Sequence, residues 1–154
     1  MEIVKVTDNT QKVLSETDEA IETALNTIGA EAEKYAKNLV LVDTGLLRNS
    51  ITFVTKKHPG STFKDVSPSD GENGTAFVSK SSGGTRYGVE EQVELDEKNS
   101  VVIGTNVSYG IYVETKSYKG KGPNHFLTRA VNDHIDKYKR ILEEEIKGAL
   151  AKIV

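Results

Sequence analysis

The tripeptide Asp43-Thr44-Gly45 is the strongest candidate for chemistry in this sequence. Aspartic peptidases use the same tripeptide to present one carboxylate of a dyad that shares a proton, and a second copy of Asp43 in a dimer would supply the other. Here, however, a long predicted helix precedes the tripeptide and a helical turn follows it, whereas the peptidase tripeptide lies between strands. We therefore interpret Asp43 or Thr44 as the cap of a short helical turn. A dimeric aspartic peptidase using Asp43 is the alternative.

Other reactive residue types do not form a second candidate centre. His125 and His134 are nine residues apart on one predicted helix, so their side chains point to opposite faces and cannot bind one metal ion. His58 stands alone at the entrance of a loop. The chain has no Cys, which excludes disulfides, thiolate metal sites and cysteine nucleophiles. We therefore expect no catalytic centre, no metal ion and no cofactor.

Length and composition indicate one domain over residues 1–154. Hydrophobic residues make up 36% and charged residues 28% of the chain, which suits a single modest core. Twenty Lys and Arg against 23 Asp and Glu give a formal charge of −3, so sequence-specific DNA binding is not expected. The longest apolar run, Leu39 to Val42, is far shorter than the roughly 20 residues of a membrane span. No secretory signal opens the chain, so we expect synthesis in a cytoplasm and no membrane partner.

Two long amphipathic helices position the candidate residues. From Thr10 to Val40 the apolar residues follow steps of three, four and seven, which keep them on one face, and Gly29 marks a place where this helix could bend. A second apolar stripe runs from Asn124 almost to the end of the chain. Each helix would be about 45 Å long, as long as a compact domain of this size is wide. We therefore expect their ends to overhang or to pack on another subunit.

Strands are predicted between the two helices. Ile51–Lys57 alternates in the manner of a strand, and Arg86–Leu95 and Ser100–Val107 are predicted to pair as an antiparallel hairpin. The polar segment Pro59–Thr85 is expected to be an exposed arm or flexible loop, in which only Thr75–Ser79 resembles a strand. The predicted fold class is α+β: a long N-terminal helix, an antiparallel sheet of three to four strands with a long loop insertion, and a long C-terminal helix.

Charge is unevenly distributed along the chain. Met1 to Ser50 carries five bases and nine acids, so the first predicted helix presents an acidic outer face. We interpret that face as a solvated surface, with a repulsive wall facing DNA as the alternative. Farther along, Lys116, Lys119 and Lys121 lie close to Tyr118 in the sequence. A solvated loop explains this cluster, and contact with a phosphate backbone is the alternative.

Three stretches resemble, in order and spacing, the motifs of one family. They are V-D-T-G-L-L-R-N-S-I from Val42 to Ile51, V-I-G-T-N-V-S-Y-G-I-Y-V-E from Val102 to Glu114, and Pro123 followed by Phe126, Leu127 and Ala130. Together they resemble the head-tail joining, or tail-completion, family of long-tailed phages, typified by gene product ten of the lambdoid phage Hong Kong ninety-seven. The sequence departs from the family pattern at Gly110, where Ala is usual, and at His125, where Pro is usual. The Pro59–Thr85 segment resembles an insertion.

This resemblance implies a structural phage or prophage virion protein, a small subunit of the neck between the head connector and the tail tube. The implied partners are other copies of the chain, most readily as a hexameric ring, and the other neck, connector and tail-tube proteins, with at most passive contact with DNA. The implied location is the virion neck or tail end, after synthesis in the bacterial host cytoplasm. A third possibility is a non-catalytic adaptor that binds a partner through the Pro59–Thr85 arm.

The motifs also nominate contact residues. Arg48 and Glu114 are the charged members of the two best motifs, and we expect an ion pair between them within the chain or a contact between subunits. Tyr109 and Tyr112 suit either a core or an interface, because their rings are amphipathic. Leu46 and Phe126 complete the set of expected intrachain or subunit contacts.

Overall fold

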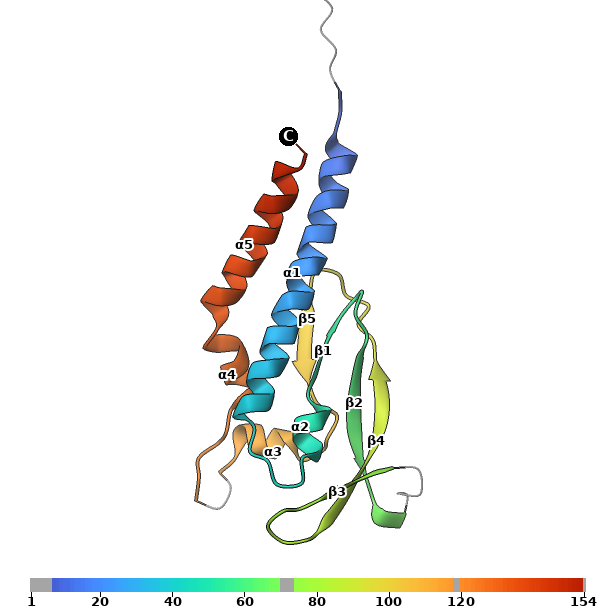
Figure 1. The fold of residues 1–154 in the computed structure, drawn as a ribbon, viewed down its shortest axis with the longest axis vertical. Coiled ribbons are helices and arrows are strands. Elements are labelled where there is room, and N and C mark those ends of the chain that lie inside the picture. Colours follow the sequence, from blue (N-terminus) through green and yellow to red (C-terminus); the bar gives the residue numbers. More distant parts are fainter. Residues whose placement is uncertain (1–6, 70–73, 118–119, 154) are drawn as a thin grey trace, which may run out of the picture.

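One long helix organises the fold. The computed structural model describes residues 7–69, 74–117 and 120–153. In it, α1 (Thr10–Leu39) has 30 residues and lies between the strands on one side and the C-terminal helices α4 (Phe126–Asn132) and α5 (Ile135–Ala151) on the other (Figure 1). The predicted α+β class, with a long N-terminal helix, antiparallel sheets and C-terminal helices, is confirmed.

Two small antiparallel sheets lie beside α1. In the first, β1 (Thr52–Thr55) pairs with β5 (Val101–Gly104), and β1 falls within the strand predicted over 51–57. The second has the strand order β2-β4-β3, where β2 is Gly60–Val66, β4 is Thr85–Val93 and β3 is Thr75–Val78. The segment 59–85 therefore contributes two strands, although the sequence indicated only one of them.

The hairpin predicted between 86–95 and 100–107 is wrong. Both segments contain a strand, but β4 pairs with β2 over residues 87–93 and with β3 over residues 85–88, and not with β5. The chain instead crosses to the other sheet, where β5 pairs with β1. Asn99, in this crossing, has a left-handed φ of 56°, a conformation that Asn tolerates better than most residues.

The core lies where the C-terminal half of α1 meets the short helix α2 (Leu46–Ser50), α4 and the sheets. Its buried members are Ala36, Val40, Leu46, Leu47, Ile51, Val107, Phe126 and Ala130. Phe63 of β2 and Phe77 of β3 pack against this cluster and meet edge to face, with ring centroids 5.4 Å apart. The core therefore draws on both sheets and on the segment 59–85.

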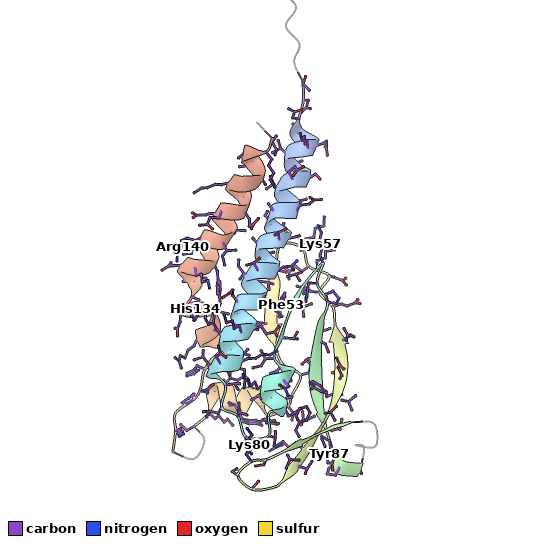
Figure 2. All side chains as sticks on the ribbon, in the orientation of Figure 1. Phe53, Lys57, Lys80, Tyr87, His134 and Arg140 are labelled. Atoms are coloured by element: carbon purple, nitrogen blue, oxygen red, sulfur yellow. The ribbon has the colours of Figure 1, made fainter. Side chains whose placement is uncertain are left out.

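Small residues form the buried side of α1. Ala20, Ala24, Ala32 and Ala36 are each at most 7% exposed. At Gly29 an added Cβ would lie 2.2 Å from the Phe53 ring, so glycine is what allows this ring to approach the helix backbone (Figure 2). The helix continues through Gly29 without interruption.

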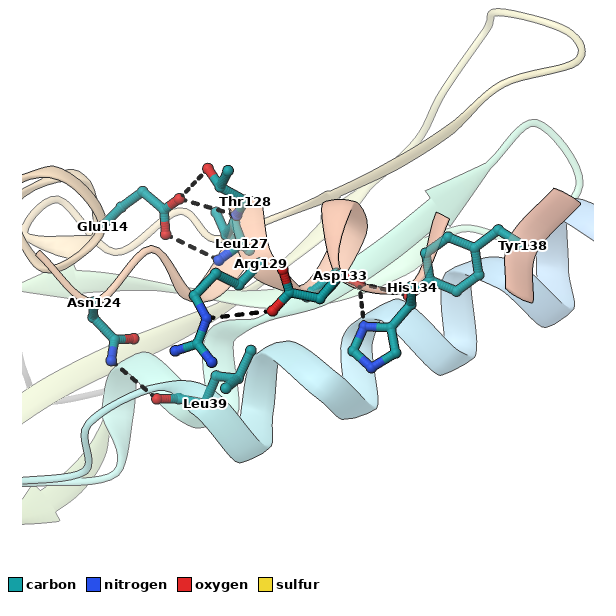
Figure 3. A network of polar contacts seen from close by, with 10 residues as sticks. Leu39, Glu114, Asn124, Leu127, Thr128, Arg129, Asp133, His134 and Tyr138 are labelled. Carbon is teal, nitrogen blue, oxygen red and sulfur yellow. Dashed lines mark hydrogen bonds and ion pairs between the residues drawn. The ribbon is translucent and has the colours of Figure 1, made fainter. Parts of the chain in front are cut away.

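The long C-terminal helix predicted from 124 onward is interrupted. It consists of α4 and α5, separated by Asp133 and His134. The His134 ring stacks on Tyr35 of α1 with centroids 3.5 Å apart, and its Nδ1 lies 3.3 Å from the Ala130 carbonyl oxygen (Figure 3). The Tyr138 hydroxyl also donates a hydrogen bond to Ala130 O at 2.6 Å, which ties α5 to α4 across the break. Within the described residues, no helix has the length and apolar character to cross a membrane.

Candidate functional site

The turn between α1 and α2 is anchored on one side and exposed on the other. Gly45 precedes α2 with a left-handed φ of 88°, which glycine adopts without strain. The Thr44 hydroxyl oxygen accepts a hydrogen bond from Leu46 N at 3.3 Å, so Thr44 supplies the predicted capping contact. Leu46 is fully buried, whereas Leu41 and Val42 are 47% and 50% exposed. The turn therefore holds apolar side chains out at the surface.

Asp43 links this turn to the connection between β3 and β4. Its Oδ1 accepts hydrogen bonds from the hydroxyl groups of Ser79, at 2.6 Å, and Ser81, at 3.0 Å. The Ser79 oxygen in turn accepts from the backbone N–H groups of Ser81 and Ser82. The Asp43 carboxylate thus accepts hydrogen bonds from hydroxyl groups of its own chain and fixes the turn to the β3–β4 connection.

The second motif leads into α3 (Gly110–Thr115) and is fixed to β2. Ser108 donates to the Asp65 carboxylate from both its backbone nitrogen and its hydroxyl, each at 2.6 Å. Burial works against ionisation of Asp65, but these two hydrogen bonds, a backbone hydrogen bond of Asp65 itself and the nearby charge of Arg86 together outweigh it and lower the pKa of the carboxyl. The Arg86 guanidinium lies 4.4 Å from the centre of the Tyr109 ring. Burial raises the pKa of the Tyr109 hydroxyl.

Glu114, at the end of the second motif, caps α4. Its Oε2 accepts from Leu127 N at 2.9 Å, and its Oε1 accepts from the backbone N and hydroxyl of Thr128 at 3.0 and 2.5 Å (Figure 3). Burial opposes ionisation of Glu114, but these hydrogen bonds outweigh it and lower the pKa of the carboxyl. The predicted ion pair with Arg48 is not formed within the chain, since Glu114 faces the first turn of α4 instead.

These segments surround a pocket of about 600 Å³, which we call the turn pocket. The α1–α2 turn and α2 contribute Leu41, Val42, Asp43, Thr44, Gly45, Leu47 and Arg48. The remaining lining comes from the β3–β4 connection and β4 (Ser81, Arg86), from Tyr109 and α3 (Tyr112, Val113) and from the segment after α3 (Lys116, Ser117, Lys121, Gly122, Asn124). Asn124 also donates to Leu39 O at 3.1 Å, which ties this last segment to the end of α1.

The turn pocket combines positive charge with exposed apolar surface. Its lining includes four cations, Arg48, Arg86, Lys116 and Lys121, and Asp43 as its one acid. Among the described residues, no acid forms an ion pair with any of these cations. Besides Leu41 and Val42, Tyr112 is 55% exposed, and its neighbour Ile111 is 60% exposed. Such a surface suits contact with a partner that offers apolar side chains and negative charge.

The structure brings together most of the residues that the sequence nominated. Asp43, Thr44, Gly45, Arg48, Tyr109 and Tyr112 all line the turn pocket. Leu46 and Phe126 lie in the core, where neither has exposed surface, and Glu114 lies in the capping network.

Several pocket residues were not nominated. Ser81 and Arg86 come from the segment around β3 and β4, and no sequence pattern places them beside the D-T-G turn. The basic cluster was the one available signal for Lys116 and Lys121, while its other members, Tyr118 and Lys119, lie outside the described residues. Across the described ranges, no group of three or more His, Asp or Glu side chains is arranged to hold a metal ion.

The fold and this site define a class of protein: a small α+β module whose signature turns form an apolar and cationic contact surface. A family model described as "Bacteriophage HK97-gp10, putative tail-component" matches residues 5–115. The chain belongs to this family of phage tail components, and the resemblance seen in the sequence is confirmed. No curated protein and no solved structure matches the chain.

The matched range has a direct structural meaning. It contains α1, both sheets and α3, and hence the D-T-G and Y-G-I-Y-V-E motifs, and it ends at the last residue of α3. The helices α4 and α5, with the third motif, lie beyond it. Family membership points to a structural role in the phage tail.

Proposed function

We propose that the protein is a structural subunit of the phage neck, a head-tail joining or tail-completion protein that acts as an oligomeric ring. A hexamer is the expected ring, by analogy with rings that terminate tails. Its partners are other copies of itself and the other neck, connector and tail-tube proteins. It occupies the neck or tail end of the virion and performs no catalysis.

The observation that carries this proposal is the exposed apolar surface at the turn pocket. Leu41, Val42 and Tyr112 line the pocket and are each about half exposed, as is Ile111 next to Tyr112; Val42, Ile111 and Tyr112 belong to the first two motifs, and Leu41 directly precedes the first. A patch of large apolar side chains rimmed by charge is typical of a protein contact surface. Burying it against another subunit would explain why the motifs hold these side chains outward.

The charge of the chain supports passive contact with DNA. The formal net charge is −3, and the amino-terminal third carries most of the excess acid. Such a subunit does not attract the phosphate backbone over most of its surface, which suits a passage that DNA must cross without adhering.

Two observations test the proposed function. Purified protein, examined by light scattering and negative-stain electron microscopy over a range of concentrations, is expected to form closed rings. Particles made without the protein are expected to show free heads, or tails that lack their ends. Complete, infective particles assembled in its absence would overturn the proposal, as would a chain that is monomeric both in isolation and in the particle.

A further inference from the structure

The amino-terminal end of α1 extends beyond the sheets, beside the C-terminal end of α5 (Figure 1). No residue from Thr10 to Glu19 is buried, and Ala20 is the first buried residue of the helix. Leu14 is 55% exposed on this end. Residues 7–19, which we call the projecting end, carry four acids and one base. The three acids that follow Leu14 are Glu16, Asp18 and Glu19.

The turn pocket lies at the other end of the same helix. Leu41 and Val42 follow α1 directly, and Arg48 and Lys116 flank them across the pocket. An α-helix of 30 residues is about 45 Å long. The projecting end and the turn pocket therefore lie at opposite ends of the long axis and cannot meet within one chain (Figure 1).

The two ends are complementary. One presents an exposed leucine among acids, and the other presents exposed apolar side chains among cations that no acid of the described residues pairs with. We propose that the projecting end of one copy docks in the turn pocket of the next copy, with Leu14 on Leu41, Val42 and Tyr112, and with Asp18 and Glu19 facing Arg48 and Lys116. This inference rests on the proposed function and specifies how the subunits join.

A contact of this kind uses two different surfaces on every copy. Such heterologous contacts repeat from subunit to subunit and close into a ring when the rotation between neighbours permits. The pocket volume of about 600 Å³ has room for Leu14 and the side chains next to it, not for a whole helix. The acids of the projecting end therefore remain at the rim, where they set the orientation of the incoming helix.

A nucleic acid is the competing occupant, because phosphate groups would also satisfy the cations. A phosphate backbone would leave Leu41, Val42 and Tyr112 uncovered, and these are the strongly exposed apolar side chains of the pocket. A partner with both acids and an apolar side chain covers the whole surface. A second copy of the chain offers both, through Leu14 and the acids of its projecting end.

Charge exchange tests the contact. The pocket variant carries Arg48→Glu and Lys116→Glu, the helix variant carries Asp18→Lys and Glu19→Lys, and a combined variant carries all four changes. Each one-sided variant is expected to weaken self-association at least about tenfold, and the combined variant to return to within about threefold of the unaltered chain. Sedimentation velocity measures association, and circular dichroism checks folding.

Exposed lysines on the sheet side provide the matched control. Lys57→Glu with Lys64→Glu changes the charge by the same amount as the pocket variant and is expected to leave association unchanged. The same variants are scored for complementation of a phage that lacks the protein, so that rescue by the combined variant is also read in particles. Titration with a fluorescent DNA duplex tests the competing occupant.

The outcomes separate this contact from the proposed function. Rings that persist in both one-sided variants, or a combined variant that rescues neither association nor complementation, overturn the contact and leave the ring proposal standing. If the pocket variant loses DNA binding but still self-associates, the pocket is assigned to nucleic acid, and the proposed contact between copies is overturned. The absence of any ring, in solution and in particles, overturns the proposed function itself.

Discussion

Glu114 shows how a single side chain joins the two parts of the molecule. Its carboxylate accepts three hydrogen bonds from the first turn of α4, and the adjacent backbone is closed by hydrogen bonds from Asn124 N to Val113 O and from His125 N to Glu114 O. The α4 N–H groups would otherwise lack partners, because the first turn of a helix has no acceptors of its own. The charged residue of the second motif is therefore an anchor for the C-terminal helices.

Replacing this anchor should be destabilising and dependent on pH. Glu114→Gln keeps the shape of the side chain but weakens its acceptors, and we expect the free energy of unfolding to fall by about 1 to 2 kcal/mol at pH 7. The folded pKa of Glu114 is lowered, so its contribution is complete above the ordinary pKa and is lost as the pH falls through the folded value. Urea unfolding at pH 7 and at decreasing pH should show the two proteins converging in acid.

The matched control is Glu144→Gln, an exposed carboxylate of α5. Its unfolding curve should follow that of the unaltered chain at every pH. A constant difference between Glu114→Gln and the unaltered chain across the whole pH range would show that the ionised carboxylate is not the stabilising group.

Asp43 permits a direct choice between a structural and a catalytic role. Asp43→Asn weakens the hydrogen bonds from Ser79 and Ser81, and we expect a loss of about 1 to 2 kcal/mol in unfolding free energy. Ser79→Ala removes the same contact from the other side and should show a similar loss. In a double-mutant cycle the two losses should not add, because both remove one interaction. Peptidase activity that pepstatin blocks and Asp43→Asn abolishes would instead support the catalytic alternative.

At the scale of elements, Gly29 is where the Phe53 ring of β1 packs against the backbone of α1. Elsewhere in a helix, Gly→Ala stabilises by roughly 0.5 to 1 kcal/mol. Gly29→Ala should reverse this sign and destabilise by about 1 to 3 kcal/mol, because the new Cβ would lie 2.2 Å from the Phe53 ring. Thermal and urea unfolding measure the change.

Gly148 in α5 is the matched position. An added Cβ there meets no atom within 4 Å, so Gly148→Ala should be stabilising. Adding Phe53→Leu to Gly29→Ala should recover part of the loss by removing the ring from the contact. Equal effects at the two glycines would contradict the packing argument.

The segment 59–85 is the element that the sequence described least well. Its Gly, Ser and Asp content predicts a loop, yet β2 is held by contacts that periodicity does not reveal. Thr62, 1% exposed, donates to Ser50 O at 2.5 Å, and Asp65 receives Ser108. These are polar contacts between segments distant in the sequence, so no local pattern could predict them.

The long helices were predictable because their apolar spacing is local, and the first two motifs located the site, since both contribute residues that line the turn pocket. The path of β5 and the break at His134 were not predictable. β5 pairs with β1, a strand distant in the sequence, and the His134 ring stacks on Tyr35 of another helix, so no local pattern indicates either contact. Only part of the lining of the turn pocket was predicted from the sequence, since Arg86 and Ser81 come from a segment that contains no motif.

The contacts of the segment 59–85 define a test of its proposed adaptor role. Replacing residues 67–84 with a short Gly/Ser linker retains β2 and β4, and we expect the chain to fold with a moderate loss of stability from the removal of Phe77. Removing residues 60–66 should prevent folding. Circular dichroism and unfolding curves distinguish the two. Assembly that survives the first replacement would exclude partner binding through β3, whereas its loss in a folded variant would support the adaptor role.

At the scale of the whole molecule, the structure separates residues that fold the subunit from residues that remain available for contact. The core occupies the half of α1 that ends at the turn pocket, together with α2, α4 and both sheets. At the other end, α1 and α5 run side by side beyond the sheets (Figure 1), with Leu14 and Leu150 both exposed. A helix end of this kind contributes little to the stability of the subunit, since it buries little surface.

Removing the projecting end as far as Leu14 should therefore affect assembly far more than folding. A chain that begins at Ser15 loses no buried residue, and Ser15 can cap the shortened helix, so we expect unfolding free energy to change by less than about 1 kcal/mol. Self-association should weaken about tenfold, because Leu14 no longer reaches a neighbour. Leu14→Ala in the full-length chain should weaken self-association by most of the same factor, which would attribute the loss to the Leu14 side chain. Full assembly by both variants would mean that the projecting end stays in solvent and that the subunits join elsewhere.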